Sequence, residues 1–158
     1  MAKKKIKSVQ TSGKRKTAIA RANVKKGQGR VRVNGSPIEI MEPEMARLKA
    51  MEPLQIADAM KKLSKVDITV DVQGGGIMGQ VDAIRTAVAR GLVHWNGGKD
   101  GEDEELKAEY LRFDRSLLVN DPRRKEPKHQ MGRGARKKWQ KSYRCCLLYT
   151  SDAADENP

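Results

Sequence analysis

The feature that most constrains the fold is a stretch near the end of the chain, residues 121–144, which carries ten Lys or Arg, two acids and almost no apolar side chains. Such a segment buries too little apolar surface to offset the entropy lost on ordering, so we expect it to be disordered when alone in water. Fully extended, its 24 residues would span roughly 80 Å at about 3.3 Å each. The folded core must therefore come from the preceding part of the chain, and the stretch itself needs a polyanion to lie on.

Positive charge is concentrated at both ends of the chain. Residues 1–33 hold twelve Lys or Arg and no acid, whereas residues 34–120 carry a net charge of −4 in a chain whose total is +13. A nearly neutral domain between two cationic segments is typical of nucleic-acid binding. A membrane surface would need a basic helix with a bulky apolar face, which neither end contains, and we expect no membrane partner. The sequence contains neither a run of transmembrane length nor a signal-peptide core.

Candidate catalytic and metal-ligating residues are few. The only cysteines, Cys145 and Cys146, are adjacent and have no partner elsewhere, so we expect no disulfide framework and a cytoplasmic, reducing setting. His94 and His129 have no second ligand at metal spacing, and no nucleophile-elbow, P-loop or H-E-x-x-H pattern occurs. We therefore predict a protein that is not an enzyme, with no metal, cofactor or small-molecule substrate.

The first part of the sequence reads as strands. Alternation predicts a strand over residues 9–24. Residues 25–29 should form a hairpin loop, and residues 30–33 should form a strand that returns beside the first. Asn34-Gly35 is a strong hairpin signal, so a short third strand is expected over residues 36–40. The outward faces of these strands would carry three basic side chains, Arg21, Arg30 and Arg32.

Helices are expected later in the chain, together with one more strand. Pro43 and Pro53 each sit where a helix could begin, and apolar residues at helical spacing follow over residues 54–63. Strict alternation predicts a strand over residues 66–72, and a helix with an apolar stripe should follow over residues 81–95. Arg85 and Arg90 should lie outside that stripe. The helix should stop at residues 96–98, and a further helix should follow the acidic residues 100–105. The fold class indicated is α+β, an antiparallel sheet with helices on one face.

Gly74, Gly76 and Gly79 match the G-x-G-x-x-G pattern of dinucleotide-binding proteins between a strand and a helix. No second apolar strand follows that helix, so the βαβ unit that the pattern requires is missing. Two explanations stay open for these glycines. Gly75 and Gly76 would let the backbone approach an RNA phosphate at a helix N-terminus, or the glycines would serve a turn that needs positive φ.

The basic stretch also contains residue types suited to RNA. Five arginines can contact phosphate in bidentate fashion, and Trp139 and Tyr143 could stack on unpaired bases. If six to ten cations each met a phosphate, affinity would fall by roughly 10³ to 10⁵ between 50 and 200 mM salt. The alternative is an unstructured solubilising tail.

Several separated motifs resemble the small-subunit ribosomal protein S-nine family, in its archaeal and eukaryotic branch. The resemblance runs from about Val9 to Arg144. It rests on GKRKTA at residues 13–18, RVRVNG at 30–35, GGG at 74–76 with GQ at 79–80, AIR at 83–85, AR at 89–90, DPRR at 121–124, EPK at 126–128 and QKSYR at 140–144.

The resemblance implies a fold, a location and a set of contacts. The implied fold is that of the second domain of ribosomal protein S-five, and the implied location is the head of the small ribosomal subunit, on the 3′ major domain of its rRNA. The tail would extend toward the anticodon stem-loop of the P-site tRNA, and neighbouring head proteins would be further partners. Residues implied to contact tRNA are Arg144, Tyr143 and Lys141. Residues expected to bind rRNA are Lys14, Arg15, Lys16, Arg21, Gly75, Gly76, Arg123, Arg124, Arg133, Arg136, Lys137 and Lys138.

The sequence departs from the family pattern after Arg144, where fourteen residues without Lys or Arg follow. We interpret residues 145–158 as an atypical extension, non-native or disordered, whose acids would repel tRNA phosphates. The expected organisation is a basic extension over residues 1–8, a globular RNA-binding domain over 9–120 and an extended basic tail over 121–144. A free-standing architectural nucleic-acid-binding protein is the alternative function, because charge alone does not choose between polyanions.

Overall fold

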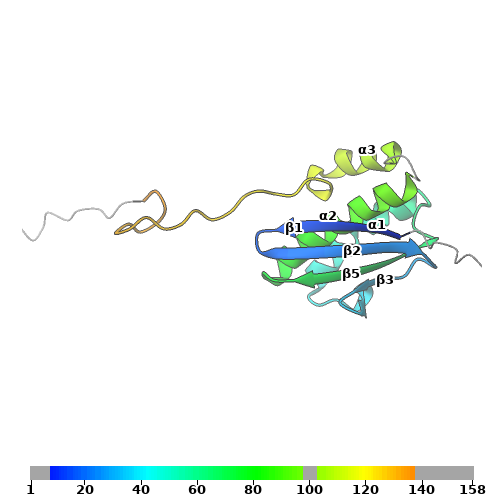
Figure 1. The fold of residues 1–158 in the computed structure, drawn as a ribbon, viewed down its shortest axis with the longest axis horizontal. Coiled ribbons are helices and arrows are strands. Elements are labelled where there is room, and N and C mark those ends of the chain that lie inside the picture. Colours follow the sequence, from blue (N-terminus) through cyan, green and yellow to red (C-terminus); the bar gives the residue numbers. More distant parts are fainter. Residues whose placement is uncertain (1–7, 98–102, 138–158) are drawn as a thin grey trace, which may run out of the picture. The chain divides into compact units, whose positions relative to one another are not determined.

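The computed structural model describes residues 8–97 and 103–137 of the chain (Figure 1). The chain divides into two compact units, Met1–Arg123 and Arg124–Pro158. All helices and strands below belong to the first unit. They are β1 (Ser8–Arg15), β2 (Ala18–Lys26), β3 (Val31–Val33), β4 (Ser36–Pro37), the 3-10 turn η1 (Ile38–Ile40), α1 (Glu44–Ala59), β5 (Val66–Gln73), α2 (Ile77–Asn96), α3 (Glu104–Phe113) and the 3-10 turn η2 (Arg115–Leu117).

The five strands form one mixed sheet in the order β1-β2-β5-β3-β4. The prediction of a wholly antiparallel sheet is wrong at one position, because β3 does not return along β2 but pairs with β5 in parallel. The reason lies in strand length. β5 pairs with β2 along residues 19–26, whereas β3 has only three residues to offer. The chain between β3 and β5 is long enough to cross over through α1, as a parallel pair requires.

One face of the sheet is covered by helices and the other is open (Figure 1). Alternate residues of β2, from Ala18 to Val24, are buried toward α2, and the intervening residues are exposed or half-buried. Small residues let α2 lie very close to the sheet. A Cβ at Gly13 of β1 would lie 2.1 Å from the carbonyl oxygen of Ala83, and one at Gly91 would lie 2.7 Å from a methyl of Val24.

The Asn34-Gly35 turn is confirmed, with φ of 49° and 85° at the two residues. The side chain of Asn34 also bonds the backbone of Val72 on β5: its Nδ2 donates to the carbonyl at 3.3 Å and its Oδ1 accepts from the amide at 2.8 Å. The strand expected over residues 36–40 is shorter than predicted. It ends at Pro37 and continues as η1, because the proline lacks the amide that a ladder needs.

α1 is one helix that begins directly after Pro43, and the prediction that a helix begins at Pro53 is wrong. Pro53 lies inside the helix and removes one helical hydrogen bond. The helix continues past it because the buried stripe runs on both sides of the proline, from Ala46 to Ala57. The carbonyl of Pro53 also accepts a hydrogen bond of 2.8 Å from the buried Tyr110 hydroxyl of α3.

α2 is buried on more than one side, so the expectation that Arg85 and Arg90 lie outside its packed surface is wrong. Arg85 is buried, and Arg90 is half-buried. Its Nε donates to the carbonyl of Leu118 and its Nη1 to that of Ser12, both at 2.8 Å. The chain after α3 covers this second side of α2, which periodicity in α2 alone could not reveal. α2 ends at Asn96 as expected, and Asp103 caps the acid-led helix α3.

Gly13→Ala should destabilise the fold by about 1–3 kcal/mol, because the new methyl would be forced into the backbone of α2. Gly79→Ala, in the first turn of α2, is the matched control. A Cβ there would meet only ordinary contacts at 3.8 Å and beyond, so we expect no loss and a gain of up to about 1 kcal/mol from helix propensity. Urea unfolding of both variants measures the difference. Equal stability of the two would contradict the close contact of β1 with α2.

Candidate nucleic-acid interface

The β1–β2 turn carries three consecutive predicted RNA-binding cations, Lys14, Arg15 and Lys16. Lys14 belongs to the open face of the sheet and is exposed, and Lys16 is exposed in the turn itself with a φ of 53°. Arg15 belongs to the opposite, helix-covered face, and its side chain is only 18% exposed. The structure therefore divides this triplet between two surfaces.

The glycine loop before α2 packs against this turn. Gly74 and Gly75 have φ of 78° and 70°, and a Cβ at Gly74 would lie 2.7 Å from the carbonyl oxygen of Thr17. A Cβ at Gly75 would lie 3.0 Å from that of Ala18. Positive φ and close backbone approach thus both explain these two glycines, whereas Gly76 is in open space with neither constraint. A phosphate contact at Gly75 and Gly76 stays a prediction.

Asp121 ties the end of the first unit to β1. Its Oδ2 accepts from Nη2 of Arg123 at 2.7 Å and pairs with Nη2 of Arg15 at 3.2 Å. Nη1 of Arg15 donates in turn to the carbonyl of Arg123, and the amide of Lys14 donates to Oδ1 of Asn120, both at 3.3 Å. The hydrogen bonds from Arg123, with the nearby charge of Arg15, lower the pKa of Asp121 to about 2. Residues 120–123 are therefore fixed against the β1 end.

Asp82 on α2 extends this set of ion pairs to the helices. It pairs with Arg15 at 3.6 Å, with Lys49 of α1 at 2.6 Å and, at the 4.0 Å limit, with Arg85 one turn along its own helix. Arg15 is thus shared between two carboxylates, one on α2 and one at residue 121. Because its charge is already matched, Arg15 is less available to a phosphate than its sequence context implies.

Arg85 is the most buried cation of this cluster. It pairs with Glu52 of α1 and, at 3.3 Å, with Asp114 after α3. A polar cavity of about 630 Å³ is lined by these side chains together with those around Asp82 and Asp121. Its lining contains nearly equal numbers of cations and carboxylates. The ion pairs among them stabilise the first unit, and the cavity offers little uncompensated positive charge.

The open face of the sheet is the main basic surface of the described first unit. Its charged side chains are Lys14, Arg21, Lys25, Arg30, Arg32, Asp67 and Asp71. Arg21 lies opposite Asp71 in the β2–β5 register. Two hollows of about 370 and 330 Å³ flank this pair, and both are lined by Arg21 and Asp71. An extended polyanion could follow this face past Arg21.

One of the two acids on this face, Asp67, accepts hydrogen bonds from backbone amides. Oδ1 of Asp67 accepts from the amides of Gln28 at 2.7 Å and Arg30 at 3.0 Å. These hydrogen bonds hold the pKa of Asp67 below its usual value, and the one from the amide of Arg30 has the largest effect. Asp67 therefore keeps the loop before β3 in place while the arginine side chains point outward.

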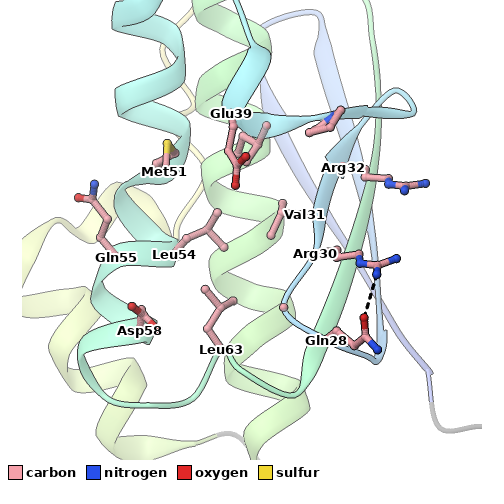
Figure 2. Close-up of a pocket in the computed structure, with 13 residues that line it drawn as sticks. Gln28, Arg30, Val31, Arg32, Glu39, Met51, Leu54, Gln55, Asp58 and Leu63 are labelled. Carbon is pink, nitrogen blue, oxygen red and sulfur yellow. Dashed lines mark hydrogen bonds between the residues drawn. The ribbon is translucent and has the colours of Figure 1, made fainter.

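A largely apolar cavity lies on the other side of β3, and Arg30 and Arg32, which also belong to the basic surface, form part of its wall. It has a volume of about 390 Å³, and Val31, Leu54 and Leu63 point into it (Figure 2). Arg30 and Arg32 point away from it, and Nη2 of Arg30 donates to Oε1 of Gln28 at 2.8 Å (Figure 2). The alternation of the strand thus assigns the apolar and basic side chains of β3 to different surfaces.

The described part of the second unit, residues 124–137, contains four predicted RNA-binding residues, Arg124, Arg133, Arg136 and Lys137, all exposed. Arg136 makes a bidentate pair with Glu126, with Nη2 to Oε1 at 2.7 Å and Nε to Oε2 at 2.9 Å. The amide of Arg133 donates to the carbonyl of Lys137 at 2.9 Å. This segment thus forms a local turn that is held by its own contacts.

Four predicted contact residues, Lys138, Lys141, Tyr143 and Arg144, lie outside the described residues, as does the extension over residues 145–158. Sequence reasoning placed Arg30 and Arg32 on the outward face with Arg21 without naming them as rRNA-binding residues, and it assigned Lys25 to a loop. Lys25, Arg30 and Arg32 belong to the same open face. Strand parity was the available signal for Lys25, four residues after Arg21.

Two kinds of feature are absent from residues 8–97 and 103–137. None of the helices there is long and apolar enough to cross a membrane. No group of three or more His, Cys, Asp or Glu side chains in these ranges could hold a metal ion.

Fold and surface together define a small α+β protein with Lys and Arg gathered on the uncovered face of a mixed sheet and in the segment that follows. The chain belongs to the ribosomal protein S9/S16 family, whose model matches residues 13–144. It is 54% identical over 139 residues to the small ribosomal subunit protein uS9 of Methanothrix thermoacetophila, covering 88% of this chain and 100% of that protein. It is 56% identical over 134 residues to the protein of the same name in Halobacterium salinarum, covering 85% of this chain and 97% of the relative. The family resemblance seen in the motifs is thereby confirmed.

Asp121→Asn should weaken the attachment of residues 120–123 to β1 at neutral pH. It should also change how the free energy of unfolding depends on pH in the acid range. A carboxylate whose folded pKa is lowered to about 2 stabilises the fold above its unfolded pKa, 3.8, and loses that effect as pH falls toward 2. The stability difference between the wild type and the variant should therefore be constant above about pH 5 and shrink between pH 4 and 2. Chemical unfolding at a series of pH values measures it. A difference independent of pH throughout would contradict the ion pairs of Asp121.

Proposed function

We propose that the chain is a non-catalytic structural component of the small ribosomal subunit that binds rRNA in the subunit head. Membership of the S9/S16 family carries the proposal, and the curated relatives bear the name of a small-subunit protein. The charge distribution supports it, because the open sheet face carries exposed Lys and Arg and residues 1–33 and 121–144 are strongly basic. The location that follows is the cytoplasm, on the ribosome.

On the globular unit, the proposed rRNA surface is the open face and the β1–β2 turn. Lys14, Lys16 and Arg21 are exposed there, Gly75 lies against Thr17 and Ala18 beside the turn, and Gly76 follows in open space. Arg15 contributes through its ion pairs, because they hold the turn and residues 120–123 in place. Lys25, Arg30 and Arg32 extend the same surface along the sheet.

The proposed tail begins at residue 121 and continues the rRNA contact. Its proposed phosphate-binding residues are Arg123, Arg124, Arg133, Arg136, Lys137 and Lys138. Arg123 and Arg136 each have a carboxylate partner, so a phosphate would have to replace Asp121 and Glu126 or share the guanidinium with them. Such an exchange is feasible because solvent-accessible ion pairs contribute little to stability.

We further propose that the end of the tail reaches the anticodon stem-loop of the P-site tRNA through Lys141, Tyr143 and Arg144. The match of the family model extends to residue 144 and so includes these three residues. The proposed organisation keeps the boundaries 1–8, 9–120, 121–144 and 145–158, and the acids after residue 144 would oppose the tRNA contact.

Sedimentation of a cell extract at physiological salt tests the proposed function. The chain should be found with small subunits. A chain that sediments free of them, and that binds random duplex DNA as tightly as rRNA fragments at raised salt, would instead support the free-standing architectural binder.

Arg21→Gln should weaken rRNA binding by the purified chain and lower the slope of log affinity against log salt by about 0.7–0.9, the contribution of one phosphate contact. Arg47→Gln is the matched control. Arg47 lies on α1, on the covered side of the sheet, and pairs with Glu44 at 3.6 Å. Filter binding at several salt concentrations measures both slopes. Identical slopes for the two variants would exclude the open face as the RNA surface.

Removal of residues 141–144 should leave the globular unit folded and the subunits assembled, while P-site tRNA dissociates faster. Two cations and one aromatic ring would be lost from the proposed contact, and residues 141–144 belong to the second unit. Removal of residues 155–158 is a control of equal length. Nitrocellulose retention of tRNA on assembled subunits measures the effect, and equal retention by the two deletions would argue against the tRNA contact.

A further inference from the structure

An apolar groove lies between η1 and the first turns of α2, with a volume of about 320 Å³. Its rim is formed by Pro37, Ile40, Met41, Glu42, Ile77 and Gln80, and we call this surface the η1 groove. Ile40 is 70% exposed and Ile77 is 56% exposed. Two large aliphatic side chains from separate elements thus face solvent around one hollow, an arrangement that marks interaction surfaces.

The η1 groove has no Lys or Arg among its lining residues. The chain around η1 carries three exposed acids, Glu39, Glu42 and Glu44, and no base from residue 33 to residue 46. The first base beyond them, Arg47, pairs with Glu44. In a chain of net charge +13 this is a locally acidic region.

RNA is a poor occupant for such a surface. Phosphates would meet exposed carboxylates with no cation in the groove lining to offset the repulsion, and the isoleucines could not bond ribose or phosphate. Complementary chemistry would be an apolar side chain to fill the hollow, flanked by Lys or Arg to pair with the acids. Both features together belong to a protein segment.

The first turn of α2 separates this groove from the proposed RNA surface. On one side, Gly79 lies near the carbonyl oxygen of Arg15 in the β1–β2 turn, 3.8 Å from where its Cβ would be. On the other side, Ile77 and Gln80 line the groove together with η1. A bound protein segment and bound RNA could therefore occupy the two sides of the same helix turn without competing for residues.

We propose that the η1 groove is the docking site for a segment of another small-subunit protein in which an apolar side chain is flanked by Lys or Arg. The proposal rests on the proposed function, since it places that protein beside this chain in the same particle. The apolar side chain enters between Ile40 and Ile77, and the flanking cations pair with Glu39 and Glu42.

Site-specific photo-crosslinking in assembled subunits tests the proposal. The full-length chain, with a benzophenone amino acid in place of Ile77, is first shown by sedimentation to enter small subunits, which tests the proposed function separately. Irradiation should then join it to a small-subunit protein, at a peptide with Lys or Arg within a few residues of the crosslink. The same probe in place of Thr69, on the open face of the sheet, should crosslink to rRNA.

Three outcomes at position 77 would overturn the proposal: a crosslink to rRNA, a crosslink to a second copy of this chain, or no crosslink in subunits that contain the chain. Charge is tested with Glu42→Lys in a chain that carries the probe at Ile40. We expect the protein crosslink to fall about two- to five-fold, the effect of losing one exposed ion pair. Glu109→Lys, on the exposed face of α3, should leave the yield unchanged, and an equal yield for both variants would refute a basic segment.

Discussion

The close contact of β1 with α2 is the constraint on which the rest of the structure depends. Gly13 has no side chain because the backbone of α2 at Ala83 and Ala87 occupies the space that a Cβ would need. The hydroxyl of Thr11 donates to the carbonyl of Ala87 at 2.7 Å, which fixes the strand on the helix at this depth. A larger residue would lift β1 and, with it, the β1–β2 turn. The basic turn therefore owes its position to a missing side chain in the strand before it.

The acids of the first unit act mainly as internal partners. Asp82 and Asp121 hold Arg15, Asp114 and Glu52 hold Arg85, and their ion pairs join the helices, β1 and residues 120–123. Breaking such a pair would leave a poorly solvated charge, so these contacts fix where the elements meet even where their net contribution to stability is small. Arg21 and Arg32 take no part in these pairs and are exposed on the open face, where solvent or RNA can reach them.

Several patterns within a single element predicted the structure well, although the one strand predicted over residues 9–24 is two strands, β1 and β2, joined by a turn at Lys16. Contacts between elements were predicted poorly. Alternation located β5, and Asn34-Gly35 located the turn after β3, because both signals are complete within a few residues. The position of β3 beside β5 could not be predicted in this way, because it depends on which of two strands offers the longer ladder to β2. The prediction that a helix begins at Pro53 was wrong for a related reason. The burial that outweighs the lost hydrogen bond of Pro53 comes from packing against other helices.

The same limit applies to the candidate site. Arg21 was identified correctly as an outward-facing cation, because strand parity decides it. Arg15 was grouped with its neighbours Lys14 and Lys16, although its partners at residues 82 and 121 are remote in sequence. Arg85 has the same spacing as an exposed helix residue, but it is buried and pairs with Glu52 of α1 and with Asp114 after α3. Side chains whose role depends on a distant partner are the ones that local patterns assign wrongly.

Charge distribution also indicates an order of events. Within the open face, Arg21 faces Asp71, and the acids of the remaining first unit neutralise most of its other cations, so this unit can fold without RNA. Residues 121–144 hold ten cations and two acids, and no rearrangement of their own contacts can balance that excess. The electrostatic screening length at 0.1 M salt is about 10 Å. Cations that are close neighbours along an extended segment therefore still repel one another. An external polyanion would balance this excess, whereas the surfaces proposed to receive rRNA and, at the η1 groove, a protein segment are already formed within the first unit.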